Sequence, residues 1–329
     1  METRAGRRKR RPRRWVRIFL LVFTICLLGT GVFAYNFYTD MVSAVDKMHN
    51  PISREVSEKR EDKVEFNEKD PISILLVGID EREGDAGRTD TMIVMTINPE
   101  KKSTKLLSIP RDTRAKLINP NNPDKNRVDK MNHAYAYGGI EMTISSIENF
   151  LNVPIDYYTE VNMQGFKDIV DAVGGIKVDN QYEFELDGVY LQEGIQTLDG
   201  EEALQYARMR KDDPRGDFGR QERQKEVISK VIDKGKSLSS LTNYDEILEA
   251  LQENIVTNLT LKDIIGIQSD YKIAAETIEK LEIEGQGITL NNGVWYFQVD
   301  DLTRQALSDE LREHLGLNKE DVTPSNVEY

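Results

Sequence analysis

Ile72-Ser-Ile-Leu-Leu-Val-Gly-Ile-Asp80 decides the fold, because it is a short apolar run that ends in a glycine and an aspartate. Such a run is typical of a buried strand. The runs at 92–97 and 104–109 have the same character, and we expect them to be its neighbours in one sheet. Helical spacing at 140–151 precedes another strand-like run at 157–161. Strands that alternate with helices in this way predict a layered α/β domain.

The remainder of the domain continues the alternation. A helix at 163–173 should stop at Gly174-Gly175, because glycine readily takes the left-handed conformation that ends helices. Further along the chain, the pattern predicts helices at 200–207, 219–234, 244–254, 261–280 and 300–315, and a hairpin over 288–299 around Asn291-Asn292-Gly293. We therefore place one domain at 70–318 and a loose tail at 319–329.

The N-terminus predicts a membrane anchor. Residues 1–17 hold nine basic residues and one acid, and 18–35 carry no charge. A helix of that length spans about 27 Å, close to the ~30 Å hydrocarbon core. The positive-inside rule keeps the basic flank in the cytoplasm and puts the bulk of the chain outside. We expect a single-pass type II protein of the cell membrane, with its catalytic domain extracellular.

Three other interpretations of the N-terminus are less favoured. A cleaved signal peptide is opposed by the length of the run and by the poor cleavage site Gly31-Val-Phe-Ala34. The basic segment could bind nucleic acid, but membrane topology explains its position better, and we expect no nucleic-acid partner. A buried core helix does not fit such flanks. Residues 36–69 are polar and charged, which predicts a solvated stalk.

Arginines are concentrated in one segment of a chain that is otherwise acidic. After Arg17 the chain carries 35 basic and 56 acidic residues, yet five of its 14 arginines there lie between Arg208 and Arg223. The planar guanidinium matches phosphate oxygens two at a time. A self-neutralised, solvated charge run is the alternative, because Asp212, Asp213, Asp217 and Glu222 are interleaved.

Two strand ends carry further candidates. The loop 78–90 follows one buried strand and precedes another, and it contains Asp80, Asp85, Asp90, Arg82 and Arg88. Carboxylates with no His or Cys nearby suit Mg²⁺, which completes its shell with water and phosphate. A solvated acidic loop is the other interpretation. Arg111-Asp112 follows Pro110 at the end of the next strand, and on its own it could be a surface ion pair.

Arg220 strengthens the case for an anion site. It lies in the first turn of the helix at 219–234, and it shares a face with Gln224, Val227, Ile228 and Val231. An arginine that points inward at a helix N-terminus is costly unless an anion receives it. Other chemistries find little support. The only cysteine, Cys26, lies in the apolar span, the three histidines have no metal-ligand spacing, and neither GxSxG nor GxxxxGK[ST] occurs.

Together these segments resemble the LytR–CpsA–Psr family over essentially the whole chain. The landmarks are LLVGIDER, GRTDTM, LSIPRD, NHAYAYGG, VDAVGG and YARMRKDD–GDFGRQERQ, in that order. The resemblance implies an α/β/α domain with a central mixed sheet after one transmembrane helix. It also implies a transferase that moves an anionic glycopolymer (wall teichoic acid) from a polyprenyl-pyrophosphate carrier to a peptidoglycan hydroxyl, the C6 hydroxyl of N-acetylmuramic acid, with a phosphodiester as product.

The resemblance also implies roles for individual residues. Asp80 and Asp90 would hold Mg²⁺ or Mn²⁺ against the pyrophosphate. The phosphates would be bound, and the reaction catalysed, by Arg88, Arg111, Arg208 and Arg210, with Arg82, Arg220 and Gln224 as further phosphate ligands. An apolar groove inside the α/β core would hold the polyprenyl tail. Two alternatives stay open at this point: hydrolysis of the lipid pyrophosphate by water, and a non-catalytic surface regulator that senses lipid-linked sugars and needs no Mg²⁺.

Overall fold

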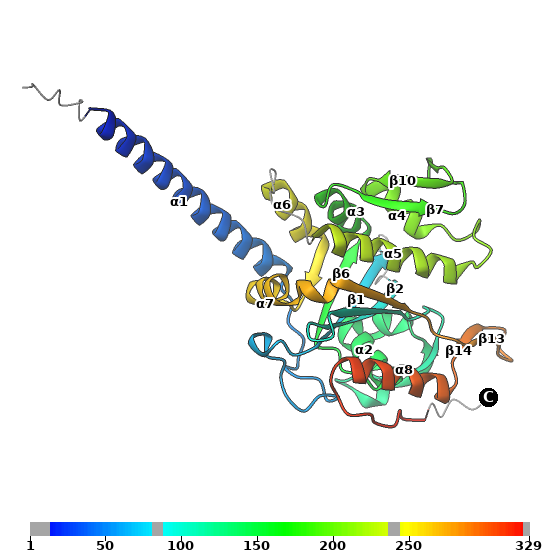
Figure 1. The fold of residues 1–329 in the computed structure, drawn as a ribbon. Coiled ribbons are helices and arrows are strands. Elements are labelled where there is room, and N and C mark those ends of the chain that lie inside the picture. The colour runs from blue at the N-terminus through cyan, green and yellow to red at the C-terminus, as the bar shows by residue number, and fades with distance from the viewer. Residues whose placement is uncertain (1–13, 81–87, 236–243, 325–329) are drawn as a thin grey trace, which may run out of the picture. The chain divides into compact units, whose positions relative to one another are not determined.

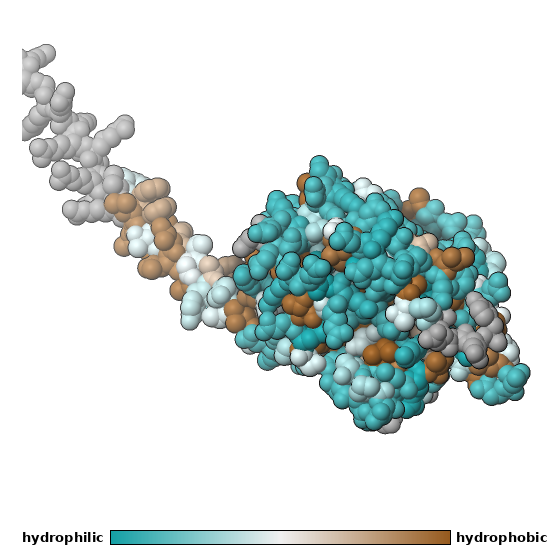
Figure 2. Space-filling view, turned by 90° about the horizontal axis from the view of Figure 1, so that it is seen from below, coloured by the Kyte–Doolittle hydropathy of each residue, from teal (hydrophilic) through white to brown (hydrophobic). Residues whose placement is uncertain are grey.

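The structure is a computed structural model that describes residues 14–80, 88–235 and 244–324. The chain divides into two compact units between Ser43 and Ala44. The first unit is most of helix α1 (Arg14–Met48), whose side chains from Ile18 to Phe33 are exposed. Among the described residues, this helix alone is long and apolar enough to cross a membrane, over Ile18–Met48. Hydrophobic residues dominate its coloured part in Figure 2, as a membrane anchor requires.

The second unit is built on a six-stranded sheet with the order β11-β6-β1-β2-β3-β12. Strand β1 runs parallel to β6 and antiparallel to β2, whereas β3 runs antiparallel to β2 and parallel to β12. The sheet is therefore mixed, as expected. Its strands are β1 (Ile72–Asp80), β2 (Arg88–Asn98), β3 (Ser103–Ser108), β6 (Tyr157–Asn162), β11 (Ile255–Thr257) and β12 (Thr277–Leu281).

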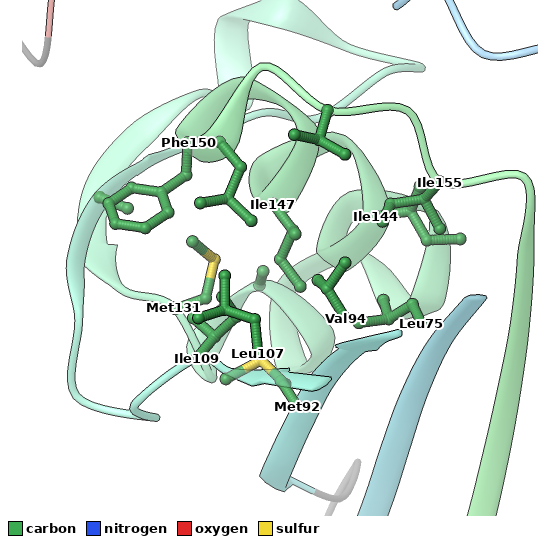
Figure 3. Packing of buried hydrophobic residues seen from close by; sticks show 14 of the residues in the cluster. Leu75, Met92, Val94, Leu107, Ile109, Met131, Ile144, Ile147, Phe150 and Ile155 are labelled. Atoms are coloured by element: carbon green, nitrogen blue, oxygen red, sulfur yellow. The ribbon is translucent and has the colours of Figure 1, made fainter. Parts of the chain in front are cut away.

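Helices cover both faces of this sheet (Figure 1). Along β1, Leu75 and Val77 join the main apolar cluster with α2 (His133–Leu151) and α8 (Asp301–His314), because successive side chains of a strand point to opposite faces. Figure 3 shows side chains of the strands and of α2 converging in that cluster. On the other face, Ile72 and Ile74 pack with α5 (Asp217–Gly235). The expected α/β/α layering is confirmed.

A smaller apolar cluster lies beside the main domain core. It is formed by α3 (Met163–Ala172), α4 (Gly200–Arg208), β7 (Ile176–Asn180), β8 (Phe184–Leu186), β9 (Val189–Leu191) and β10 (Gly194–Leu198). Gly174 and Gly175 follow α3 with φ of 76° and 77°, which confirms the predicted left-handed helix stop. Helix α6 (Tyr244–Asn254) contacts α3.

Two hairpins flank the end of β3. One consists of β4 (Arg114–Leu117) and β5 (Arg127–Lys130), which the sequence pattern did not predict. The other consists of β13 (Gln286–Thr289) and β14 (Trp295–Gln298), and it turns at Asn291-Asn292-Gly293 as predicted. Phe297 joins the two hairpins, because it forms a parallel bridge with Thr113.

The predicted helix at 261–280 is wrong in its second half. The helical part α7 (Leu261–Gly266) passes into a π-helical turn, Ile267–Tyr271, and a 3₁₀ turn, Lys272–Glu276. The chain then enters β12, which pairs with β3 over five residues at the edge of the sheet. That pairing joins segments 170 or more residues apart, so local periodicity could not reveal it.

The solvated stalk predicted for 36–69 is wrong from Ala44 onward. The last residues of α1 are buried, and the segment that follows is fixed to the second unit by ion pairs. Arg54 donates two hydrogen bonds of 2.6 Å to the Glu148 carboxylate, and Arg60 forms an ion pair of 3.0 Å with Asp156. Val64 is buried in an apolar cluster. The segment looked solvated because its charges find their partners far away in the sequence.

Candidate active site

The site begins at an irregularity between β1 and β2. Gly78 pairs with Thr91, and Ile79 pairs with Thr89, so Asp90 is an extra residue in β2. A β-bulge of this kind re-aims a side chain and is frequent next to active sites. Here it places the Asp90 carboxylate within 2.8 Å of Arg111 Nη1, and the Asp90 carbonyl 3.4 Å from Arg220 Nη2. Asp90 therefore connects two arginines that lie far apart in the sequence.

Arg111 is held at the end of β3 by the backbone on both sides. The Ile109 amide donates to Met92 in β2, Pro110 ends the strand, and the Asn132 amide donates to the Arg111 carbonyl at 3.1 Å. Burial disfavours the charge on Arg111, but the hydrogen bond to Asp90 and the negative charges of Asp90, Asp217 and Asp112 together outweigh it and raise the pKa of the guanidinium. The side chain is one-quarter exposed, so a ligand can still reach it.

Arg220 points inward from the first turn of α5, as its helical face predicts. Its side chain is 10% exposed, and Nη2 lies 2.8 Å from an oxygen of Asp217. Burial, together with the charge on Arg111, lowers the pKa of this guanidinium. Its Nε is buried and has no hydrogen-bond acceptor within the described residues. A desolvated cation with an orphaned donor next to a second cation is a receptor for an anion.

Arg223 holds the arginine-rich segment in place. It donates to the carbonyls of Tyr206 and Met209, and its Nη1 lies 2.5 Å from Asp213, whose side chain is fully buried. One turn from Arg220, Gln224 is buried and donates to the Ala207 carbonyl at 3.4 Å. Part of the interleaved charge run is therefore a structural clamp, and it fixes the backbone that leads to Arg210.

A cavity of about 540 Å³ opens beside these residues. Three cationic side chains line it: Arg111, Arg210 and Lys130. The Lys130 ammonium donates to Asp112 at 2.6 Å, whereas the Arg210 guanidinium has no hydrogen bond or ion pair in the part of the chain that the structure describes. The remaining wall consists of Pro110, Asp112, Gly216, Asp217, Phe218, Gln221, Gly285, Gly287, Trp295 and Phe297.

The structure brings together some of the predicted site residues and not others. Asp90, Arg111 and Arg220 form one cluster, and Arg210 shares the cavity with Arg111. Arg208 is engaged elsewhere, because its Nη1 donates to Asp187 at 2.6 Å and to Gln205 at 3.0 Å. Its role as a phosphate ligand stays a prediction.

Four further candidate residues lie in or next to the turn between β1 and β2. Asp80 and Arg88 face each other as paired backbone positions at the start of that turn, which places both near Asp90 in the sheet. Their side chains lie outside the described part of the structure, as do Arg82 and Asp85 in the loop itself.

Sequence reasoning missed Lys130, Gln221 and the aromatic residues of the cavity. Lys130 lies on β5, a strand that the pattern did not predict, and it comes two residues before the NHAYAYGG landmark begins. The aromatic run Trp295-Tyr-Phe297 follows a recognised hairpin turn. These aromatic residues were the available signal of a binding surface, because a hairpin can form without large aromatic side chains after its turn.

The donor chemistry of the site is compatible with Mg²⁺. Groups of three or more metal-binding side chains do not occur among the described residues, so the protein alone offers no complete cage there. Mg²⁺ needs only one or two carboxylates when phosphates and water complete its shell. The Asp90 carboxylate is 35% exposed and still has one oxygen without Arg111.

Known proteins resemble this chain over nearly its full length. The family model described as the LytR_cpsA_psr family matches residues 35–313. A Bacillus mycoides protein named polyisoprenyl-teichoic acid–peptidoglycan teichoic acid transferase TagU is 45% identical over 298 residues, which cover 91% of this chain and 96% of that protein. The Bacillus subtilis protein of the same name is 44% identical, with 94% and 98% covered.

Solved structures agree with these relatives. A structure described as "TagT bound to LIIa-WTA" is 36% identical with a TM-score of 0.69, and the match covers 82% of this chain and all of that one. The crystal structure of Bacillus subtilis TagU is 42% identical with a TM-score of 0.59, and the match covers 78% of this chain and all of that one.

Proposed function

The chain belongs to the LytR–CpsA–Psr family, and we propose on that basis how its site works. It is a transferase that transfers teichoic acid to peptidoglycan, the activity named for its TagU relatives. The donor in our proposal is a polyprenyl pyrophosphate that bears the glycopolymer, the acceptor is a peptidoglycan hydroxyl, and the product is a phosphodiester.

The single observation that carries the mechanism is the Asp90–Arg111–Arg220 cluster, of which Arg111 lines the cavity. Arg220 is desolvated, lies next to a second cation and keeps one buried N–H without an acceptor. A diphosphate supplies the oxygens that such donors lack. Arg210 adds a further guanidinium from the cavity wall.

The reaction forms one P–O bond and breaks another. The acceptor hydroxyl oxygen attacks the phosphorus that carries the glycopolymer, the bond to the bridging oxygen breaks, and polyprenyl phosphate leaves with the bond electrons. The hydroxyl proton passes to a base that we leave unassigned, because the Asp90 carboxylate is committed to Arg111. The arginines bind the diphosphate, orient it in line and stabilise the charge on the leaving oxygen, which is most of what phosphoryl transfer requires.

Asp90 and Asp80 are the residues that would hold Mg²⁺, or Mn²⁺, against the diphosphate. When bound, the ion neutralises phosphate charge. The bulge that turns Asp90 toward Arg111 supports this assignment, because it places a carboxylate beside the cations that would bind the phosphates.

The membrane context follows from the nature of the donor. A lipid pyrophosphate cannot leave the bilayer, so an enzyme fixed to the membrane by α1 meets its substrate there. We propose a type II orientation with an extracellular domain, since the basic residues before the span favour the cytoplasm. The polyprenyl tail would enter the apolar cluster between the sheet and α2, where Ile144, Ile147 and Phe150 lie (Figure 3).

The test is a transfer assay with the full chain in lipid vesicles. Lipid-linked glycopolymer, Mg²⁺ and peptidoglycan are supplied together, and the joined polymer and the released polyprenyl phosphate are quantified. Wild type should give both products in equal amounts. Arg111→Ala should reduce the rate about 10²–10³-fold, the typical cost of losing a charge-stabilising contact.

A second arm omits peptidoglycan. If polyprenyl phosphate is released equally fast without acceptor and no joined product ever forms, the enzyme is a hydrolase and the transfer mechanism is wrong. If the chain binds the lipid but releases nothing under either condition, it is a sensor rather than an enzyme.

A further inference from the structure

The cavity beside the arginines has an aromatic wall that phosphate binding does not use. Trp295 is 46% exposed and Phe218 is 40% exposed, yet both line the cavity. We propose that Trp295 is the stacking platform for a sugar ring of the acceptor glycan, and that Phe218 extends this platform. The inference rests on the proposed function, because it names where the acceptor of that reaction binds.

Two glycines, one in β13 and one just before it, make room for the aromatic rings of β14. Gly287 lies diagonally across the hairpin, and a Cβ at that position would come within 2.9 Å of the indole nitrogen. At Gly285, a Cβ would lie 2.6 Å from both the Phe297 ring and the Gln298 carbonyl. The rings therefore occupy the space that side chains would fill, and the indole lies against Gly287. Nearly half of Trp295 stays exposed and can be reached by a ligand.

The hairpin is joined to the catalytic cluster by backbone contacts. The Phe297 amide donates to the Asp112 carbonyl at 2.9 Å, and Asp112 is the neighbour of Arg111. The Phe218 ring meets the Phe297 ring edge to face, with 5.6 Å between centroids, and Phe218 is two residues before Arg220 in α5. The aromatic wall and the cationic cluster are therefore connected directly, so a sugar on Trp295 would lie close to the diphosphate.

The chemistry of the wall favours a sugar over a polyprenyl tail. A sugar presents an apolar C–H face to an aromatic ring and hydroxyls to polar groups, and Lys130, Arg210 and Gln221 supply such groups at the same cavity. A polyprenyl tail needs an unbroken apolar surface, which these charges interrupt. An acetamido sugar can use both the aromatic surface and the polar groups of the wall.

The chain allows a direct test by fluorescence, because it contains two tryptophans, Trp15 and Trp295. Trp15→Phe leaves Trp295 as the only indole in an otherwise intact full chain. This variant is titrated in detergent with a soluble N-acetylglucosamine–N-acetylmuramic acid tetrasaccharide, without any lipid donor. We expect a saturable blue shift of the emission, since a sugar bound to the exposed part of the indole removes water from it.

The second measurement is the steady-state kinetics of variants made in the otherwise wild-type chain. Trp295→Ala should raise the KM for the glycan acceptor roughly five- to tenfold, the worth of one aromatic contact, and leave the KM for the lipid donor within about twofold. Trp295→Phe should recover most of the loss. The matched control is Tyr190→Ala, which removes an aromatic residue that is 55% exposed on β9 and does not line this cavity. Thermal unfolding of each variant shows whether its hairpin still folds.

Three outcomes would overturn the inference. The Trp295 emission could ignore the tetrasaccharide while the enzyme still transfers, or Trp295→Ala could leave the acceptor KM unchanged. The emission could instead respond to soluble glycopolymer fragments and not to the tetrasaccharide, which would assign the platform to the donor. Failure of the proposed function looks different, because then the tetrasaccharide still shifts the emission but wild type forms no joined product.

Discussion

The guanidinium of Arg111, at the end of β3, and the carboxylate of Asp90, in the bulge of β2, lie 2.8 Å apart. The two strands are neighbours in the sheet, so this contact is set by strand register and not by a mobile loop. A charge pair that is fixed before substrate arrives needs little reorganisation during the reaction, which is how preorganised sites stabilise charge. The same contact makes Asp90 a poor general base.

Asp90→Asn tests this relationship. The amide keeps the size of the side chain but removes the charge that pairs with Arg111, and it is a weaker metal ligand. We expect transfer to fall about 10²–10³-fold, with a higher Mg²⁺ concentration needed for half-maximal rate. The assay is transfer measured across a Mg²⁺ titration. Glu279→Gln, which removes an exposed partner of Lys105, should leave the rate unchanged. An Asp90→Asn enzyme with the wild-type rate would exclude Asp90 from the site.

Arg220→Met separates binding from stability. Arg220 is desolvated and keeps an unpaired Nε, whereas its partner Asp217 is 29% exposed and can be rehydrated. The free energy of unfolding should therefore change by less than about 1 kcal/mol. Stabilisation of the protein by inorganic pyrophosphate should disappear, and transfer should fall about 10²-fold. Urea unfolding with and without pyrophosphate measures both effects. A large loss of stability without pyrophosphate would show that Arg220 serves the fold.

Arg223, in contrast to Arg220, should contribute to the stability of the fold. Removing it leaves Asp213, whose side chain is fully buried, without the guanidinium that donates a hydrogen bond to it. Arg223→Ala should lower the free energy of unfolding by about 3–5 kcal/mol. Arg215→Ala is the control, because Arg215 lies 3.9 Å from the same carboxylate but is 55% exposed, and it should cost less than about 0.5 kcal/mol. Similar urea midpoints for the two variants would show that Arg223 does not stabilise the arginine-rich segment through Asp213.

His314 predicts how stability depends on pH. The ring is buried against the Thr96 and Ser103 hydroxyls at 2.7 and 2.9 Å. Burial, with the nearby ammonium groups of Lys105 and Lys101, lowers the pKa of His314 to about 4 from 6.5. The unfolded chain then binds more protons between these values, so stability should fall as the pH drops from about 6.5 to 4, by roughly 3 kcal/mol.

The measurement is the free energy of unfolding by urea at several pH values in that window. His314→Gln keeps one hydrogen bond without the titration, so its curve should be flatter there by that amount. Parallel curves for the variant and the wild type would show that another group causes the acid sensitivity.

The sequence predicted those elements of the fold that depend on neighbouring residues in the chain. The apolar run of β1 and the glycines after α3 specify their structures through burial and a positive φ, and both predictions are confirmed. The edge strand β12 and the segment with Arg54 and Arg60 depend on partners 90 or more residues away, which no window of sequence can see. Predictions failed at those two places for that reason.

The site residues show the same division between local and long-range determinants. Arg220 was predicted to face inward from its helical position, and it does so. Arg208 belongs to the same charge run, but it ends its helix and turns to Asp187. The family motif could not show this difference between the two arginines. Lys130 and Trp295 reach the cavity only because two hairpins meet at Phe297, a tertiary contact without a sequence signature.

The most direct measurement is a crystal structure of the chain with a short-chain polyprenyl pyrophosphate and Mg²⁺. We predict phosphate oxygens within hydrogen-bonding distance of Arg111 and Arg220, including the Nε that now lacks an acceptor, and the metal ion on Asp90. A diphosphate bound elsewhere, with the Arg111–Asp90 pair intact and the Nε of Arg220 still unpaired, would contradict the account.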